Sequence, residues 1–585
     1  MVESLPPPPL ADQGRRLRIS LSIIMVLFLV IAVRLVQFQF MDGAAYAAQG
    51  LSLRLQPVDL PAPRGNIVDR NGAILAGSAE ARYVYADPDL VKDPAKAADA
   101  LSPVLGVPRS ELLPKLVPHR RDDGTVARFE YLARGVPVDT GTRVSDLNFA
   151  GIGVRRDESR VVPGHDLAAN LIGFTGRDMN GLEGLEASYD DLLRGVDGKR
   201  TFEIGQLGLD QEIPGGYHQE KPARPGSTLQ LTVDRDLQYE VQRILGSRMT
   251  QAKATVAAAV VLDVRTGEVL AQASYPFFNA ANTSASKASD RGDAATGLVV
   301  EPGSVHKGIV FAACLQEGKV KPDDLVTVGP SIRKGDTTYT DTHVNQTPRA
   351  MTLPGILAMS SNVGTIELAD RLGAQKLYEY QRAFGLGETT GEGLPGESPG
   401  MVQPPANWSS SSYGSIPVGH GVSVTPLQMA AVYATIANGG VYVKPHLVSA
   451  VISPDGTVAP SKAAPTRPVI SAENATALRT MLEAVVTVKD GTGKAAAVDN
   501  YRVSGKTGTG KLIRDGKTVD GEVASFVGMA PADAPRYVIA VFAHTPSGNG
   551  GAVASPAFSE MMSYTLRHFK VAPTGTKVQP FQVYG

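Results

Sequence analysis

A serine and a lysine stand three residues apart in the stretch EPGSVHKGIVFAACLQEG, residues 301–318. If a helix begins just after Gly303, Ser304 and Lys307 project from the same face of its first turn. A serine hydroxyl becomes a good nucleophile when a neighbouring base takes its proton, and a lysine can be that base only as a neutral amine. Burial and the positive potential of a helix N-terminus both disfavour the charged amine. The pair therefore predicts a serine nucleophile that is served by an amine base.

The same residues also allow a purely structural interpretation. Ser304 could cap the helix, and Lys307 could be a solvated residue of the first turn. Two neighbouring residues are given no catalytic role. Cys314 is predicted to lie in the core, and His306 to pack or to lie at the surface. A single cysteine excludes an internal disulfide and a thiolate metal cluster. The choice between the two interpretations depends on polar groups elsewhere in the chain.

Two further groups could converge on this pair. Ser360, Ser361 and Asn362 form a short polar break between two helical runs. Such a break can aim a hydroxyl and an amide at one point, although an ordinary loop or helix cap would look the same. Residues 506–509, Lys-Thr-Gly-Thr, follow the strand pattern YRVSG. At a sheet edge they suit a peptide substrate with a carboxylate, because the strand can pair with the peptide and the lysine can bind the anion.

The N-terminus predicts export. Residues 19–33 carry no charge, and Leu35 and Val36 continue the apolar run past Arg34, so the segment is just long enough to span a bilayer, which takes about 20 residues. Basic residues precede this run, at Arg15, Arg16 and Arg18. By the positive-inside rule they keep the N-terminus cytoplasmic and place the rest of the chain outside. A cleaved signal peptide is the alternative, because Ala45, Tyr46 and Ala47 resemble a small-residue cleavage site.

Length and charge exclude several classes of protein. A chain of 585 residues predicts roughly three or four domain-sized units. The net charge of -1 argues against a nucleic-acid binder, since no broad cationic face is available. Residues 505–511, GKTGTGK, nearly spell a phosphate-binding loop, but Leu512 stands where magnesium binding needs serine or threonine, and an exported chain meets no ATP. We predict no cofactor and no metal.

Element patterns divide the chain near residues 220–228, which are rich in turn residues. Before this point, residues 66–76 predict a hairpin around Asn71-Gly72, a pair that tolerates a type I′ turn. Residues 181–195 predict one capped helix. Beyond the division, residues 233–249 predict an amphipathic helix and residues 255–275 two strands. Three further strand patterns near the end complete five strands, which suggests an antiparallel sheet packed against the central helical region.

In their order along the chain, the groups S-x-x-K, S-x-N and K-T-G resemble the signature of penicillin-binding proteins and serine β-lactamases. Residues 63–72 and 160–174 look like the non-catalytic pedestal of class B penicillin-binding proteins. Residues 418–440 resemble the helix that follows the second motif in that family, and residues 525–541 resemble its last strands. The likeness runs from the anchor to about residue 570.

The resemblance implies an α/β fold of the α+β type with five segments. These are a cytoplasmic tail over 1–18, a transmembrane anchor over 19–40, an elongated mixed pedestal of the dimerisation type over 41–225, a transpeptidase domain over 226–570 with a five-stranded antiparallel sheet flanked by helices, and a tail over 571–585. The resemblance offers no expectation for the tail.

The resemblance also implies roles for the first two groups. Ser304 would be the acylated nucleophile and Lys307 its general base. Ser360 and Asn362 would assist proton transfer and hold the substrate amide. A second basic group near Lys307, at Lys506, gives another reason for a lowered pKa of the Lys307 amine.

For the third group the resemblance implies substrate binding. Lys506 and Thr507 would bind the terminal carboxylate, and Gly508 would leave room for the substrate backbone. The backbone N–H groups of Ser304 and Thr509 would form the oxyanion hole, the donor pair that stabilises the tetrahedral intermediate.

The stretch PVGHGVSVTPLQ, within residues 417–428, looks most like division-type (FtsI-type) members of class B. The resemblance therefore implies a membrane-anchored serine D,D-transpeptidase that cross-links stem peptides from D-Ala-D-Ala donors, acts in septal wall synthesis and is a target of β-lactams. A glycan polymerase of the SEDS family and other division proteins would be its partners in the cell membrane. The alternatives are an elongation-type transpeptidase and a β-lactam-binding scaffold or sensor without turnover. The intact motifs argue against the scaffold, and the 18 residues before the anchor are too few for a signalling domain.

Overall fold

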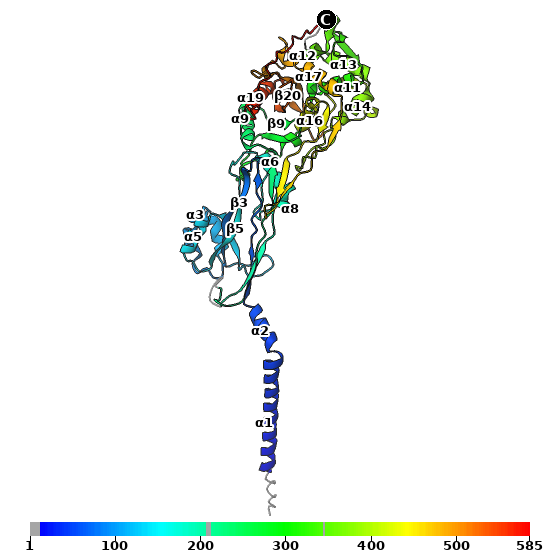
Figure 1. Cartoon of the computed structure of the whole chain (residues 1–585). Coiled ribbons are helices and arrows are strands. Elements are labelled where there is room, and N and C mark those ends of the chain that lie inside the picture. The colour runs from blue at the N-terminus through cyan, green and yellow to red at the C-terminus, as the bar shows by residue number, and fades with distance from the viewer. Residues whose placement is uncertain (1–11, 206–211, 343–345) are drawn as a thin grey trace, which may run out of the picture.

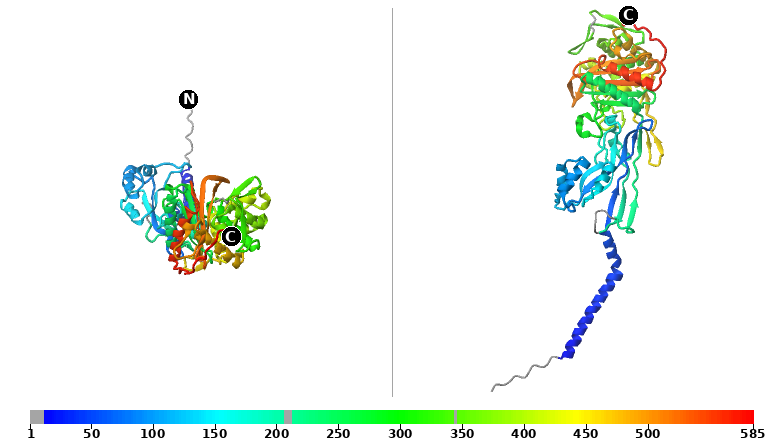
Figure 2. Two further views of the ribbon diagram at one scale, coloured as in Figure 1. Left: turned by 90° about the horizontal axis from the view of Figure 1, so that it is seen from above. Right: turned by 90° about the vertical axis from the view of Figure 1, so that its left-hand side faces the viewer.

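The computed structural model describes residues 12–205, 212–342 and 346–585, so most of the predicted cytoplasmic tail, residues 1–11, lies outside the described residues. Helix α1 (Gln13–Val36) continues through a π-helical turn (Gln37–Met41) toward α2 (Gly43–Ser52), and none of the α1 residues is buried. The span Gln13–Met41 is long and apolar enough to cross a membrane, as the sequence predicts. Figures 1 and 2 show α1 at one end of an elongated molecule and the pedestal in the middle. The half that holds the predicted catalytic residues, the catalytic half, lies at the far end.

Three helices and three strands form the core of the pedestal. The strands β3 (Ile74–Ala86), β4 (Glu130–Val136) and β5 (Ile152–Val161) pair antiparallel, with β3 between the other two. The helices α3 (Pro94–Leu105), α4 (Arg109–Leu116) and α5 (Val138–Asp146) bury Leu101, Leu112 and Val144 in one hydrophobic cluster with this sheet. A separate three-stranded sheet of β1 (Leu55–Leu60), β6 (Gly198–Glu203) and β7 (His218–Lys221) lies nearer α2.

The predicted hairpin is present, but its turn is not of type I′. Strand β2 (Ile67–Val68) pairs with β3, and only Gly72 of the turn pair has a positive φ, at 85°. Type I′ requires a positive φ at both central residues. The Asp69 carboxylate accepts hydrogen bonds from the backbone N–H groups of Asn71 at 2.8 Å and Ala73 at 2.7 Å. This side chain holds the longer loop, and the sequence pair alone did not reveal it.

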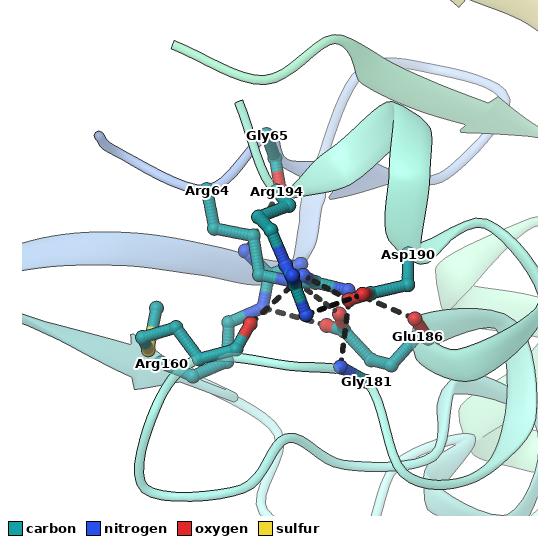
Figure 3. A network of polar contacts seen from close by, with 8 residues as sticks. Arg64, Gly65, Arg160, Gly181, Glu186, Asp190 and Arg194 are labelled. Carbon is teal, nitrogen blue, oxygen red and sulfur yellow. Dashed lines mark hydrogen bonds and ion pairs between the residues drawn. The ribbon is translucent and has the colours of Figure 1, made fainter. Parts of the chain in front are cut away.

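The predicted helix over residues 181–195 is broken into α7 (Gly184–Ser188) and α8 (Asp190–Leu193), with Tyr189 between them in a non-helical conformation. Residues on both sides of the break take part in a network of ion pairs in the pedestal (Figure 3). Glu186 of α7 binds Arg64 and Arg160 at 2.6 Å each, and Asp190 of α8 binds Arg64 at 2.6 Å. Two short helices can direct both carboxylates at one guanidinium, so tertiary contacts override the local helical pattern.

One sheet crosses the division between the two halves. Strand β8 (Thr228–Leu231) pairs in parallel with β2 of the pedestal and antiparallel with β16 (Val448–Ile452), which pairs in turn with β17 (Val458–Pro460). Backbone hydrogen bonds therefore join the pedestal to the catalytic half directly. The predicted boundaries of the five segments remain predictions.

The catalytic half is built on a five-stranded antiparallel sheet, as the sequence predicts. Its strand order is β10-β9-β21-β20-β19, and the strands are β9 (Val256–Asp263), β10 (Val269–Tyr275), β19 (Ser504–Arg514), β20 (Lys517–Ala530) and β21 (Tyr537–Thr545). Successive side chains point to opposite faces of a strand. Accordingly Ala258 and Val260 of β9 join one hydrophobic cluster, while Ala257, Ala259 and Val261 join another.

Helices cover both faces of this sheet. On one face, α9 (Arg235–Gln251) and α19 (Ala554–His568) contribute to the smaller hydrophobic cluster, and α9 confirms the helix predicted over residues 233–249. On the other face lie the apolar α11 (Lys307–Gln316) and α16 (Pro426–Ala437), whose residues from Pro426 to Ala437 are all buried. Cys314 of α11 is buried in this larger cluster, which confirms its assignment to the core.

The last residues of the chain also have a defined position, although no sequence pattern predicts one. Gly585 donates a backbone hydrogen bond to Ala350 at 3.1 Å, and Thr352 donates one to Val583 at 3.1 Å. Ala350 and Thr352 belong to β14 (Arg349–Thr352), which pairs with β11 (Leu325–Val328). The tail thus lies beside β14, joined to it by an isolated antiparallel bridge between Met351 and Tyr584, and the guanidinium of Arg349 lies over the Tyr584 ring at 3.5 Å.

Candidate active site

Ser304 and Lys307 lie at the start of α11, in a tighter helix than the sequence pattern suggests. Residues Gly303–His306 form a 3₁₀ turn, and the α-helix begins at Lys307. Residues three apart are eclipsed in a 3₁₀ turn, so the two side chains leave on the same side, as predicted. Gly303 has a φ of 56°, and a Cβ there would lie 2.2 Å from the carbonyl oxygen of Thr509. Glycine therefore allows this turn to pack against β19.

The Lys307 side chain is completely buried, and its amine contacts the S-x-N segment. Nζ donates hydrogen bonds to the Ser360 carbonyl oxygen at 2.6 Å, to Asn362 Oδ1 at 2.8 Å and to Ser360 Oγ at 3.3 Å. Burial lowers the pKa of Lys307 to about 7, and the negative charge of Asp341 acts in the opposite direction. A lysine in this state exists in large part as a neutral amine at neutral pH.

The S-x-N segment is the break between α12 (Leu353–Ala358) and α13 (Asn362–Leu372), where the sequence predicts a polar break between helices. Ser360 has a φ of 56°, in the left-handed region that serine seldom adopts. Ser361 is the N-cap of α13, and its hydroxyl accepts a hydrogen bond from the Gly364 N–H at 3.0 Å. The side-chain amide of Asn362 donates to the Thr340 carbonyl at 3.1 Å, which leaves Oδ1 directed at Lys307.

Lys506 is the second buried lysine beside Ser360. Its Nζ donates to Ser360 Oγ at 2.9 Å and to the carbonyl oxygen of Thr507 at 3.2 Å. Burial and then the nearby charge of Lys307 hold the pKa of Lys506 well below its ordinary value. The Ser360 hydroxyl therefore lies between two amines that cannot both be charged without cost. Burial accounts for the lowered pKa of Lys307, and a contribution from Lys506 stays a prediction.

Lys506 and its neighbours lie within β19 rather than at its end. The strand begins at Ser504 and runs through all of residues 506–509, and it is an edge strand of the sheet, as predicted. A Cβ at Gly508 would lie 2.4 Å from Ser525 Oγ and 2.7 Å from the Pro302 carbonyl oxygen. Internal packing therefore already requires glycine here, and space for a substrate backbone stays a prediction.

A cleft of about 400 Å³ opens above these residues. The predicted residues that line it are Ser304, Ser360, Asn362, Thr507, Gly508 and Thr509. Lys307 and Lys506 lie fully buried beneath its floor, where they reach the cleft only through their contacts with Ser360 and Asn362. The structure thus brings all eight predicted residues to one place. A peptide that pairs with the open edge of β19 would run along this cleft.

Three further residues, one that lines the cleft and two that bond to residues around it, were missed by the sequence analysis. His420 lines the cleft, and its Nδ1 lies 2.8 Å from Glu301 Oε2. Asp341 binds the start of α13 from the end of β13 (Thr337–Thr340). Glu301 and His420 lie in stretches that the analysis had already singled out, but nothing in the sequence marks Asp341, because only folding brings it to α13.

His306, in contrast, has no place in the cleft. It is buried, and its ring nitrogens contact the Pro417 carbonyl at 3.2 Å and Gln381 Nε2 at 2.9 Å. Burial lowers the pKa of His306 to about 4, so the ring is neutral. Of the two expectations for this residue, packing is confirmed and surface exposure is wrong. Within the described ranges, no three histidine, cysteine or carboxylate side chains are grouped closely enough to hold a metal ion.

Two family profiles match the chain. The profile described as the penicillin binding protein transpeptidase domain matches residues 257–563, and that of the penicillin-binding protein dimerisation domain matches residues 59–231. The first match covers the cleft and the five-stranded sheet, and the second covers the pedestal.

Known proteins resemble the chain over most of its length. Penicillin-binding protein PbpB of Mycolicibacterium smegmatis is 38% identical over 94% of this chain and 90% of its own length. Peptidoglycan D,D-transpeptidase FtsI of Escherichia coli is 33% identical over 89% of this chain and 86% of its own length. The crystal structure of penicillin-binding protein 3 from Mycobacterium tuberculosis in complex with ampicillin is similar with a TM-score of 0.70 at 31% identity, over 90% of this chain and all of that one.

Proposed function

The chain belongs to the class B penicillin-binding proteins, the D,D-transpeptidases of peptidoglycan synthesis, and we propose that Ser304 is the nucleophile of its reaction. One observation carries the proposal. The Lys307 amine is buried one helical turn from Ser304, with a pKa lowered to about 7 and with hydrogen bonds to Ser360 and Asn362. A lysine that is buried in this way, without a bonded carboxylate, is shifted toward the neutral amine, which is the form that can act as a base.

The donor peptide binds as an added strand beside β19. Thr507, which lines the cleft, donates its hydroxyl to the terminal carboxylate of the donor, and Lys506, buried beneath the floor and 3.4 Å from that hydroxyl, supplies a positive charge once the anion is bound. The scissile carbonyl then lies next to Ser304. Its oxygen accepts hydrogen bonds from the backbone N–H groups of Ser304 and Thr509, which stabilise the negative charge of the tetrahedral intermediate.

Acylation begins when the Ser304 hydroxyl attacks the carbonyl carbon of the D-Ala-D-Ala peptide bond. The neutral Lys307 amine accepts the hydroxyl proton, an ester forms and the peptide bond breaks. The proton passes through the Ser360 hydroxyl, which lies 3.3 Å from one amine and 2.9 Å from the other, to the nitrogen of the departing D-alanine. Asn362 binds both the amide of the donor peptide and the Lys307 amine and so fixes their relative position.

Transfer follows when the amine of an acceptor stem peptide attacks the ester carbon. A new amide bond forms, the ester bond to Ser304 breaks, and the proton of the amine returns to the serine oxygen through Lys307. A β-lactam enters the same sequence at its first step, because its strained amide also opens on Ser304. The chain binds peptidoglycan peptides and β-lactams as a member of this family.

We further propose that the protein is anchored in the cell membrane by α1, with its N-terminus in the cytoplasm and its catalytic half outside. The three arginines before the apolar run and the length of α1 support this orientation. Likeness to proteins named FtsI supports a role at the division septum beside a SEDS-family polymerase. Depletion in the native cell should produce filaments, whereas rounded or bulging cells would favour an elongation-type role.

The test of the nucleophile uses the full-length protein in detergent and a fluorescent β-lactam. We expect one covalent adduct per chain, lost completely in Ser304→Ala and kept in Ser284→Ala, which alters an exposed serine outside the cleft. Labelling that persists in Ser304→Ala would refute the assignment. A D-Ala-D-Ala stem peptide with an amine acceptor completes the test, since an adduct without any amide product would favour the scaffold.

A further inference from the structure

Asp341 binds the N-terminus of α13 from a separate part of the chain. Its Oδ1 accepts hydrogen bonds from the backbone N–H groups of Asn362 at 2.6 Å and Val363 at 2.9 Å. Its Oδ2 accepts one from the Ser361 hydroxyl at 2.6 Å. The same hydroxyl caps α13 by accepting from the Gly364 N–H. The helix thus has its own N-cap residue and, in addition, a carboxylate from the end of β13.

This second contact fixes the segment that holds the Lys307 amine. Ser360 and Asn362 are the neighbours of Ser361 on either side, and both contact Lys307 Nζ. Ser360 has a positive φ of 56°, a conformation that persists only where the surrounding structure enforces it. The residue before Asp341, Thr340, accepts a hydrogen bond from the Asn362 side chain. Residues 340–341 therefore hold Asn362 by its backbone and by its amide.

We propose that Asp341 is a positioning residue of the active site, which fixes Ser360 and Asn362 in the orientation in which they hold the Lys307 amine. The inference rests on the proposed role of Lys307 as the base. An ordinary helix cap would not need this residue, because Ser361 already performs that task. Asp341 touches neither the cleft nor the reacting atoms, so it acts through Ser361 and α13.

The charge of Asp341 has a second consequence, for the pH at which the enzyme works. Burial disfavours a charged Lys307, and the negative charge of Asp341 favours it, while Lys506 on β19 is the other amine that contacts Ser360. His420 and Asp490 are the other titratable groups at the cleft, on its walls. Removal of the negative charge of Asp341 would lower the pKa of Lys307, so the neutral amine would persist to lower pH. A residue that only stabilised the fold would not shift the pH profile.

Two variants separate the orientation from the charge. Asp341→Asn keeps an oxygen for the backbone N–H groups and removes the charge. Asp341→Ala removes both. Asp336→Asn is the matched control, since Asp336 is an exposed carboxylate on the same β12–β13 hairpin (Ser331–Lys334 and Thr337–Thr340) that accepts a hydrogen bond from the neighbouring Thr337 hydroxyl.

The measurement is the second-order rate constant of β-lactam acylation of the full chain between about pH 5 and pH 9. For the wild type we expect half the maximal rate near pH 7, with a decline toward acid as Lys307 is protonated. Asp341→Asn should move this midpoint down by about half a pH unit or more and keep most of the maximal rate. Asp341→Ala should move it likewise and lower the maximal rate on the order of tenfold to a hundredfold. Asp336→Asn should match the wild type.

Wild-type midpoints and rates in both Asp341 variants would overturn the inference. A lower melting temperature with an unchanged midpoint would also overturn it, because that is the signature of a structural cap alone. If Asp341→Ala fails to fold, the Asn variant still decides by its midpoint. A wild-type protein that forms no adduct would instead overturn the proposed function, so the two failures are distinguishable.

Discussion

In the pedestal, Arg64 and Arg160 are buried among carboxylates, whereas beneath the cleft Lys307 and Lys506 are buried among neutral oxygens. The side chains of Arg64 and Glu186 are each 1% exposed and 2.6 Å apart, and Arg160 binds the other oxygen of the same carboxylate. Lys307 and Lys506 are 0% exposed, and their hydrogen bonds go to hydroxyl, carbonyl and amide oxygens of Ser360, Asn362 and Thr507.

The difference separates a structural use of buried charge from a chemical one. In the pedestal each cation has an anion at hydrogen-bond distance, so the charges persist and hold three segments of the chain together (Figure 3). In the catalytic half the nearest carboxylate, Asp341, bonds to α13 instead of to either lysine. A cation without a bonded anion relieves its burial by losing its proton, and a lysine that loses its proton becomes a base.

The largest effect should come from making the catalytic cation permanent. Lys307→Arg places a guanidinium, which stays protonated at any workable pH, where the amine must be neutral. We expect acylation by a β-lactam to slow by about 10²–10⁴-fold, the usual contribution of a general base. Lys511→Arg on β19, where the cation pairs with Glu522, should acylate normally. Near-normal rates in Lys307→Arg would exclude the base role and remove the contrast between the two regions.

The next effect should appear in the pedestal and should concern stability alone. Glu186→Gln removes the anion shared by Arg64 and Arg160, so that buried Arg160 loses its carboxylate and Arg64 keeps only Asp190, which costs about 3–5 kcal/mol. We expect this loss in chemical unfolding, while the folded fraction is acylated at the wild-type rate. Arg194→Ala is the control, because Arg194 pairs with Asp190 but is 56% exposed, and its loss should stay within about 1 kcal/mol. A changed acylation rate in Glu186→Gln would break the comparison.

The smallest effect concerns buried carboxyls without a cation. Glu392 is buried and Asp293 partly buried, and the two share the side-chain amide of Gln272, at 3.0 and 3.1 Å. Burial, and for Glu392 also the charge of Asp293, raises the pKa of both groups. A group whose pKa is raised in the folded state stabilises the fold at pH values below its pKa in the unfolded chain, which is about 4.3 for glutamate. This stabilisation is lost as the pH rises.

Glu392→Gln should therefore be more stable than the wild type at pH 8, by about 1 kcal/mol or more, and this gain should vanish toward pH 4. Thermal unfolding at several pH values measures it. The matched control is Glu397→Gln in the same loop, whose carboxylate accepts hydrogen bonds from Thr390 and Gly391 and should lose stability on substitution. If Glu392→Gln were less stable than the wild type at pH 8, a buried carboxylate without a bonded cation would not be the liability that the comparison predicts.

Several features of the molecule follow from local patterns. The strands of the sheet are visible as short apolar runs, since helices bury both of its faces, and the helix α9 is visible as helical spacing of apolar residues. The three motifs are visible because each combines chemistry-bearing residues within four positions. The apolar run of α1 is visible because a bilayer fixes its length.

Other features depend on contacts between distant segments. The break at Tyr189 arises because Glu186 and Asp190 must both reach Arg64, more than a hundred residues earlier. The sheet that crosses from β2 through β8 to β16 depends on pairings that no strand pattern specifies. The C-terminal segment beside β14 has no pattern at all, because it is held by backbone hydrogen bonds that any residue can make.

The sequence by itself determined which groups are available for chemistry: a hydroxyl, two amines, an amide and an edge strand, in an order that predicts acyl transfer. The tertiary structure decided the state of these groups. Whether a lysine is a base depends on its burial and on which charges come near it, and those are set by helices and strands up to two hundred residues apart. Asp341 is the clearest example, because nothing in the sequence distinguishes it from many other polar residues, and only packing places it against α13.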